Sequence, residues 1–246
     1  MDRLIYTAMT GAKHILEQQA TNAHNLANAT TTGFRAQLDS FRAVPVQGAE
    51  LPTRAFVVDA TVGTDFSAGS LQLTGRELDV AVQGKGWLAV EKPDGSEGYT
   101  RSGSLKLSEN GVLQTQNGLN LIGDGGPITI PPDVSIAIAK DGTVSTVPVG
   151  SNPNAVQVIG RLKLVNPPEE NLVRGDDGLF KTKDGTVADA DAAVGVAGGM
   201  LENSNVSVVE SMVTMINLGR QFEMQMRLLQ NAENNATKAS QILSLG

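Results

Sequence analysis

Several residue types that support common chemistries are absent or scarce in this chain of 246 residues. It contains no cysteine, which excludes a disulfide framework, a thiolate metal site and a cysteine nucleophile. The only histidines are His14 and His24, which on a helix would lie about 15 Å apart, too far to share a metal ion. Aromatic residues make up 4% of the chain, so we expect a core of aliphatic side chains and alanine.

Long apolar runs and a basic surface are also lacking. No run approaches about 18 apolar residues, so we expect no membrane insertion. Residues 1–6 contain no basic segment followed by a hydrophobic one, so we expect no cleaved signal peptide. With 19 basic and 26 acidic residues the net charge is −7, which argues against nucleic acid as a partner, because phosphate contacts need clustered Lys and Arg.

The motifs of common enzymes are missing as well. There is no HExxH pair, phosphate-binding loop, dinucleotide fingerprint or nucleophile elbow. The glycine-rich stretch at residues 84–87 is interpreted as a turn, and Asp189 and Asp191 offer too few ligands for a calcium loop. We therefore expect no enzymatic activity, no catalytic residue, no cofactor and no bound metal ion.

The negative charge is confined to the middle of the chain. Residues 1–50 and 206–246 each carry equal numbers of acidic and basic side chains, so the net charge of −7 belongs to residues 51–205. Low net charge promotes association, whereas excess charge keeps a surface soluble. The two ends of the chain and its middle are therefore expected to have different functions.

Both ends show the apolar spacing of long helices. Alternating steps of three and four residues average 3.5, which is the spacing of a coiled-coil seam. Thr30–Gly33 should end the first helix near residue 28, and Asn203–Asn205 offers capping side chains before the second. The N-terminal series is Ile5, Met9, Ala12, Leu16, Gln19, Ala23 and Leu26. The C-terminal series is Val208, Met215, Phe222, Leu229, Ala236 and Leu243, with Met212, Gly219, Met226, Glu233 and Ser240 between them.

These two predicted seams are weak. Polar residues and glycine occupy several seam positions and alanine fills others, so each turn buries little apolar area. We expect the helices to need further helices around them, from other copies of the chain. The alternative is that they pack on the middle domain of the same chain.

The middle of the chain has the pattern of a β-rich domain. Five Asp-Gly and two Asn-Gly pairs favour tight turns between short apolar runs. Many short strands with regular turns indicate a sandwich or barrel. We predict an α+β fold class, with a coiled-coil domain from residues 1–36 and 206–246, an extended or β connector at 37–75, and a β-rich, sandwich-like or barrel-like outer domain at 76–205.

Motifs near both ends resemble a known family. Residues 22–28 (NAHNLAN) and 32–35 (TGFR), with residues 201–206 (LENSNV) and 220–223 (RQFE), are similar to the terminal signatures of bacterial flagellar rod and hook proteins. Between them, residues 78–82, 84–87, 99–103 and 159–162 resemble the β domain of that family. The chain is far too short for a hook protein. It resembles the flagellar basal-body rod family, most of all the proximal rod subunits, with the distal rod protein as the close alternative.

The resemblance implies a structural subunit of the rod in the periplasm. The terminal helices would line a tube, the β-rich domain would face outwards, and helically stacked subunits would transmit torque from motor to hook. The implied partners are other copies of the chain, other rod proteins including the distal rod protein, and the flagellar type III export apparatus. A second interpretation is a secreted β-domain binding module with helical dimerisation arms.

The terminal motifs and helices supply the candidate assembly residues. Phe34 is expected to anchor the turn after the first helix, with Gly33 giving the backbone freedom. Arg220 and Glu223 are expected to set register. The full set is Ile5, Met9, Leu16, Asn25, Leu26, Asn28, Gly33, Phe34, Asn205, Met212, Ile216, Arg220, Phe222, Glu223, Met226 and Leu229.

Overall fold

The computed structural model describes residues 2–45, 55–148, 150 and 155–244. The chain divides into two compact units. Unit 1 comprises Met1–Ala29, Ala36–Asp65 and Val206–Gly246, and unit 2 comprises Thr30–Arg35 and Phe66–Asn205. The chain therefore passes between the units after residues 29, 35, 65 and 205.

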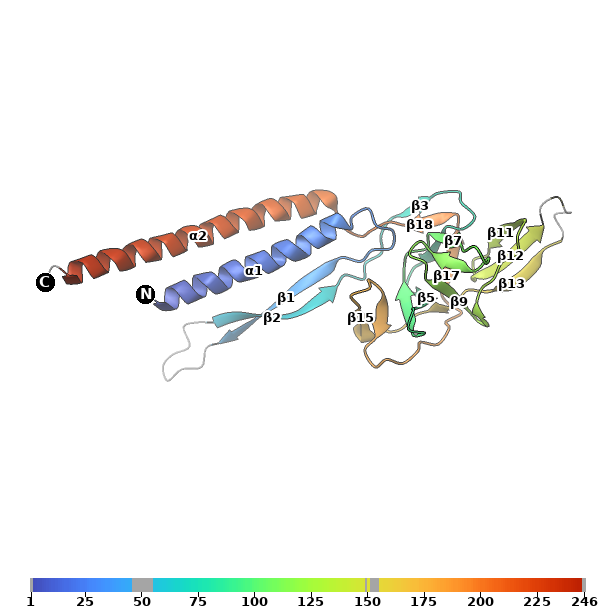
Figure 1. Ribbon diagram of the computed structural model, residues 1–246, viewed down its shortest axis with the longest axis horizontal. Helices are drawn as coiled ribbons and strands as arrows, with labels where there is room; N and C mark the ends of the chain where they lie inside the picture. The colour runs from blue at the N-terminus through green and yellow to red at the C-terminus, as the bar shows by residue number, and fades with distance from the viewer. Residues whose placement is uncertain (1, 46–54, 149, 151–154, 245–246) are drawn as a thin grey trace. The chain divides into compact units, whose positions relative to one another are not determined.

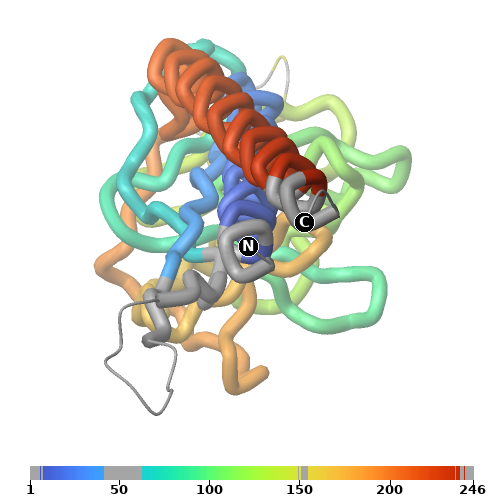
Figure 2. The backbone as a smooth tube through the Cα atoms, turned by 90° about the vertical axis from the view of Figure 1, so that its left-hand side faces the viewer, coloured from blue at the N-terminus to red at the C-terminus, as the bar shows by residue number. Residues whose placement is uncertain are grey.

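Unit 1 combines two long helices with a pair of strands (Figures 1 and 2). Helix α1 (Asp2–Ala27) runs antiparallel to α2 (Val208–Ser244) and also contacts strand β1 (Gln37–Pro45). Strand β1 pairs antiparallel with β2 (Ala55–Thr64), with an irregularity in register between Ser40 and Phe41. No helix among the described residues combines the length and apolarity needed to cross a bilayer.

The caps of α2 differ from the sequence-based expectation. Ser207 caps the helix, because its Oγ accepts a bond from the N–H of Glu210 at 3.4 Å and its carbonyl accepts the N–H of Ser211 at 2.9 Å. Asn203 and Asn205, which were expected to cap it, instead bond to Ser70 and Ser67. Their short amide side chains therefore fasten loops of unit 2.

Among the described side chains, Ala12 is the only predicted seam residue that is buried, and the other buried positions of the two helices each lie one residue before a predicted one. The buried side chains of α1 are Ala8, Ala12 and Ile15, and those of α2 are Ser211, Leu218 and Ala232. The predicted positions Met9, Leu16, Met212 and Met226 are exposed instead. Small residues at the interface allow close approach, as at Gly11, where an added Cβ would lie 3.4 Å from the side chain of Gln225.

The predicted α+β class with a coiled-coil domain is therefore wrong. The described chain is mostly β, with α1, α2 and the short 3₁₀ helix η1 (Glu169–Asn171) as its helices. The predicted seam residues are not buried together, and α1 packs on β1 as well as on α2. The side chains of Ile5, Ala236, Ser240 and Leu243 lie outside the described side chains.

Unit 2 is built from short antiparallel strands, so the β-rich middle is confirmed. Its largest sheet has the order β15-β16-β6-β5-β9-β8-β7, with β10 beside β9 and β14 beside β5. Strands β11, β12 and β13 form a second sheet, while β17 pairs with β4 and β18 with β3. The bounds are β3 Leu71–Leu73, β4 Val80–Gln83, β5 Trp87–Glu91, β6 Glu97–Thr100, β7 Leu105–Leu107, β8 Leu113–Thr115, β9 Asn120–Gly123, β10 Gly126–Pro127, β11 Val134–Ile138, β12 Thr143–Pro148, β13 Gln157–Arg161, β14 Leu164–Val165, β15 Leu172–Arg174, β16 Phe180–Thr182, β17 Gly195–Gly198 and β18 Met200–Glu202.

Strand β5 has both faces buried. Leu88 and Val90 belong to the larger hydrophobic cluster, whereas Trp87 and Ala89 belong to a second, partly aromatic cluster. Alternation along a strand sends successive side chains to opposite faces, so one strand supports both clusters. Unit 2 therefore has a core of its own.

Limited proteolysis of the free chain is expected to digest unit 1 before unit 2. Among the described side chains, five of the 29 buried hydrophobic residues lie in unit 1 and the other 24 in unit 2. Regions with few buried apolar contacts open locally at a lower free-energy cost. Fragment masses should show a resistant core that contains residues 66–205. Survival of α1 and α2 for as long as that core would contradict this expectation.

Candidate assembly surface and the segments that anchor the helices

The first half of α2 carries an exposed apolar face, which we call the outer stripe. It comprises Val209, Met212, Val213, Ile216 and Met224, whose exposed fractions range from 51% to 73%. Helical geometry places these residues opposite the buried Ser211 and Leu218, and so away from α1. An exposed apolar patch on a soluble protein is typical of an interaction site.

The predicted C-terminal site residues are divided between two faces of α2. Arg220 and Glu223 are exposed on the same face as Met212 and Ile216, and no ion pair joins them among the described residues. Phe222 and Leu229 are partly buried on the face towards α1. Met226 is 40% exposed, between the two faces.

The predicted residues of α1 have different environments. Met9 and Leu16 are exposed, whereas Leu26 is partly buried. The Asn25 side chain accepts the N–H of Gln37 and donates to its carbonyl, both at 2.8 Å, and so fastens β1 to α1. Asn28 directly follows the end of α1, and its side-chain amide donates to the carbonyl of His24 at 2.9 Å.

Gly33 and Phe34 form a tight turn within unit 2. Gly33 has a φ of +68° and donates its N–H to the carbonyl of Glu202 at 2.8 Å. Phe34 is buried, with the Arg174 guanidinium 4.5 Å from its ring centroid. The same guanidinium donates to the carbonyl of Arg35 at 3.2 Å, and burial lowers its pKa. Phe34 is thus enclosed within unit 2, in contact with Arg174.

Asn205 joins three chain segments of unit 2. Its N–H donates to the carbonyl of Phe34 at 3.4 Å, and its side-chain amide donates to the carbonyl and hydroxyl of Ser67, each at 3.2 Å. Neighbouring Asn203 bonds to Ser70 through both backbone and side chain. We call residues 30–35, 66–70 and 201–205 the root segments, because each adjoins a passage to unit 1.

A buried ionic cluster in the root segments was missed by sequence reasoning. Arg35 and Glu202 are each 1% exposed, and Arg101 is 5% exposed. The carboxylate of Glu202 lies 2.7 Å from Arg35 Nη2 and 3.0 Å from Arg101 Nη1. Burial lowers the pKa of Arg101, which the Glu202 charge opposes. Arg35 and Glu202 lie in the two terminal motifs, but neither motif indicates that these two residues pair.

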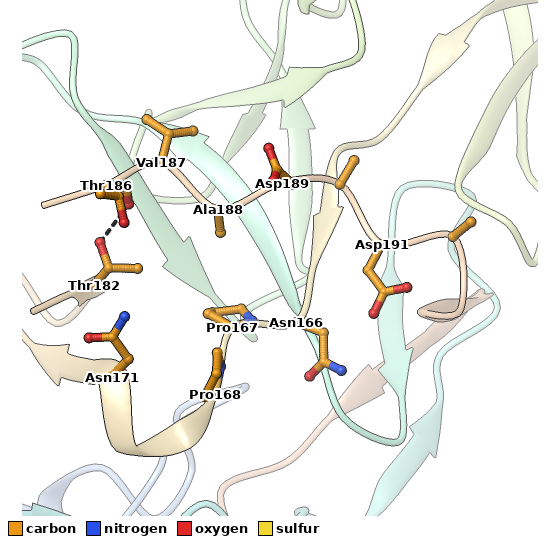
Figure 3. Close-up of a pocket in the computed structure, with 12 residues that line it drawn as sticks. Asn166, Pro167, Pro168, Asn171, Thr182, Thr186, Val187, Ala188, Asp189 and Asp191 are labelled. Carbon is orange, nitrogen blue, oxygen red and sulfur yellow. Dashed lines mark hydrogen bonds between the residues drawn. The ribbon is translucent and has the colours of Figure 1, made fainter. Parts of the chain in front are cut away.

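Unit 2 also contains an open pocket of about 410 Å³, shown in Figure 3. Its walls are residues 166–168, Asn171, Thr182 and the segment 186–192. The Thr182 hydroxyl donates to the carbonyl of Thr186 at 2.6 Å, and Asp191 Oδ1 accepts the N–H of Ala193 at 2.8 Å, so these groups are satisfied within the protein. No group of three or more metal-binding side chains lies together in the described part of the chain. We assign no ligand to this pocket.

Known proteins show extensive similarity to this chain. Residues 81–146 match the family described as flagellar hook protein FlgE/F/G D1 domain, and residues 197–242 match the flagellar basal body rod FlgEFG protein C-terminal family. The chain is 48% identical to the flagellar basal-body rod proteins FlgF of Escherichia coli and Salmonella typhimurium, over 100% of both chains. It is 30% identical to the flagellar basal-body rod protein FlgG of Borreliella burgdorferi, covering 95% of this chain and 96% of that one. The chain therefore belongs to the FlgF family of flagellar basal-body rod proteins.

Proposed function

We propose that this chain is a structural subunit of the proximal flagellar rod and assembles helically by burying the outer stripe of α2. The observation that carries the proposal is that this apolar face is exposed on a helix of 37 residues, whereas unit 2 has its own core. A rod built from such subunits would transmit torque from motor to hook. Neither an enzymatic activity nor a cofactor is needed for that role.

The energetics support burial of the stripe against neighbouring subunits. Fully burying an aliphatic or methionine side chain contributes about 1.5–3 kcal/mol, so five half-exposed residues contribute several kcal/mol per subunit. Methionine adapts to neighbours that are not identically placed, which suits Met212 and Met224. The neutral charge of residues 206–246 adds little repulsion between copies.

The expected partners are other copies of the chain and other rod proteins. FlgF relatives match at 48% identity and a FlgG relative at 30%, which favours a proximal over a distal position in the rod. We further propose that the subunit works in the periplasm after passage through the flagellar type III export apparatus. The predicted assembly residues Met212, Ile216, Arg220 and Glu223 would all lie at subunit contacts.

Complementation tests the function directly. The gene would be expressed in an Escherichia coli strain that lacks its own FlgF gene and, as a matched control, in a strain that lacks FlgG. We expect swimming in soft agar to return in the first strain only, with the chain present in isolated basal bodies. Rescue of the FlgG deletion alone would instead assign the chain to the distal rod.

A further inference from the structure

Glu202 contacts every root segment of unit 2. Its Oε1 lies 2.7 Å from Arg35 Nη2 and accepts the N–H of Gly69 at 3.0 Å. Its Oε2 accepts from Arg101 Nη1 at 3.0 Å, and its backbone carbonyl accepts the N–H of Gly33 at 2.8 Å. One residue in β18 therefore bonds to the segment before β1, to the segment after β2, and to the body of the domain.

These contacts coincide with the passages between the two units. Gly33 and Arg35 lie between α1 and β1, Gly69 follows β2, and Glu202 itself precedes α2. The backbones approach closely here, because a Cβ on Gly69 would lie 1.9 Å from the carbonyl oxygen of Asn203. All four elements of unit 1 are thus attached to segments that the Glu202 carboxylate holds together inside unit 2.

The chemistry of the cluster favours a positional role over a stabilising one. Two buried cations face one carboxylate, and none of the three guanidinium nitrogens of Arg35 makes a hydrogen bond among the described residues, so Arg35 meets Glu202 as an ion pair only. The positive charge of Arg35 also acts to lower the pKa of Arg101. Burying these charges costs desolvation free energy, and apolar residues of similar volume often stabilise a core as well. What the ionic cluster adds is a fixed relative position of the chain segments that it joins inside unit 2.

Resting on the proposed function, we infer that Glu202 is a positioning residue for assembly. Its carboxylate clamps residues 30–35, 66–70 and 201–205 into one fastened root, from which α1, β1, β2 and α2 continue. A subunit that lacks the Glu202 carboxylate keeps the core of unit 2. The root segments, from which the helices continue, are then no longer held together. Incorporation into the rod then falls by more than the loss of stability explains.

The test compares two charge-removing substitutions in the full-length chain. Glu202→Gln removes the clamp charge, and Glu97→Gln removes a carboxylate that pairs with Lys163 at 2.7 Å elsewhere in unit 2. Thermal unfolding is followed through the single tryptophan, Trp87, whose ring lies 5.4 Å from the Arg101 guanidinium. Incorporation is measured in basal bodies from the strain lacking FlgF, in which the natural chain must first restore swimming.

A designed disulfide distinguishes a positioning role of Glu202 from a purely stabilising one. It should restore incorporation only if the defect lies in the position of the root segments. The hydroxyls of Thr32 and Ser102 lie 3.2 Å apart, and the chain has no cysteine of its own, so Thr32→Cys with Ser102→Cys can fasten one root segment covalently. We expect Glu202→Gln to reduce incorporation about tenfold relative to Glu97→Gln, and the oxidised disulfide to restore most of it. Growth with a thiol reductant should remove the rescue.

Two outcomes would overturn the inference. The first is equal incorporation of Glu202→Gln and Glu97→Gln. The second is a defect of Glu202→Gln that the oxidised disulfide leaves unchanged. If Glu202→Gln yields no soluble chain, Glu202→Asp takes its place with the same expectation, because it keeps the charge but shortens the reach to both arginines. Failure of the natural chain to restore swimming would instead reject the proposed function.

Discussion

Replacing Gly33 by alanine is expected to unfold unit 2 at temperatures at which the natural chain is folded. The added Cβ would lie 2.3 Å from the carbonyl carbon of Arg101 and 2.4 Å from the nitrogen of Ser102. Backbone atoms cannot rotate away as the end of a flexible side chain can. The left-handed backbone at φ +68° adds about 1–2 kcal/mol for an alanine. We expect a total loss above about 4 kcal/mol in the free energy of unfolding.

Gly185 provides the matched control for this prediction. Its φ is +67°, nearly that of Gly33, but nothing lies within 4 Å of an added Cβ. Gly185→Ala should therefore cost only the backbone term of about 1–2 kcal/mol. Denaturant unfolding followed by Trp87 fluorescence measures both variants. Equal losses in the free energy of unfolding would show that the close approach to Arg101 is not the reason why position 33 requires glycine.

Ile216→Asp is expected to abolish incorporation into the rod while leaving the free chain folded. Ile216 is 57% exposed at the centre of the outer stripe, and substitutions at such positions usually change stability by about 0.5 kcal/mol or less. Although Arg220 lies one helical turn away on the same face, the new carboxylate would lose most of its hydration in an assembly that buries the stripe, which costs several kcal/mol. Swimming and the amount of subunit in basal bodies should both fall to background.

Gln221→Asp serves as the control for Ile216→Asp. It adds the same charge to an exposed polar position of α2 that lies about 140° around the helix axis from Ile216, outside the stripe. We expect near-normal swimming from this variant. If the two substitutions reduced swimming equally, the effect would come from added negative charge on α2 and not from the apolar stripe.

The register of the helix pair shows where sequence reasoning reached its limit. Steps of three and four residues correctly indicated two long helices, and the predicted seam residue Ala12 is buried. The other predicted row, with Met9 and Leu16, is exposed, and its neighbours Ala8 and Ile15 are buried instead. Both rows contain apolar residues at the same period, so periodicity alone cannot choose between them. Close helix packing favours the row that has Ala8 in place of the larger Met9.

The candidate site was predictable only in part. The Thr-Gly-Phe-Arg motif led to Gly33 as a turn glycine and to Phe34 as an anchor, and the structure places both in a tight turn in which the Phe34 side chain is buried. The pairing of Arg35 with Glu202 joins residues 167 positions apart, and no local pattern announces such a contact. Arg101, the third member of the cluster, directly follows β6, and its position relative to Arg35 and Glu202 depends on the fold of the whole of unit 2.

The most direct test of the central claim is the accessibility of the outer stripe before and after assembly. Since the natural chain has no cysteine, a single Ile216→Cys variant can report on that position through a maleimide label. We predict rapid labelling of the free subunit and protection of the same position in isolated basal bodies. Equal labelling of the free and assembled subunit would contradict the burial of the stripe, and with it the proposed mode of assembly.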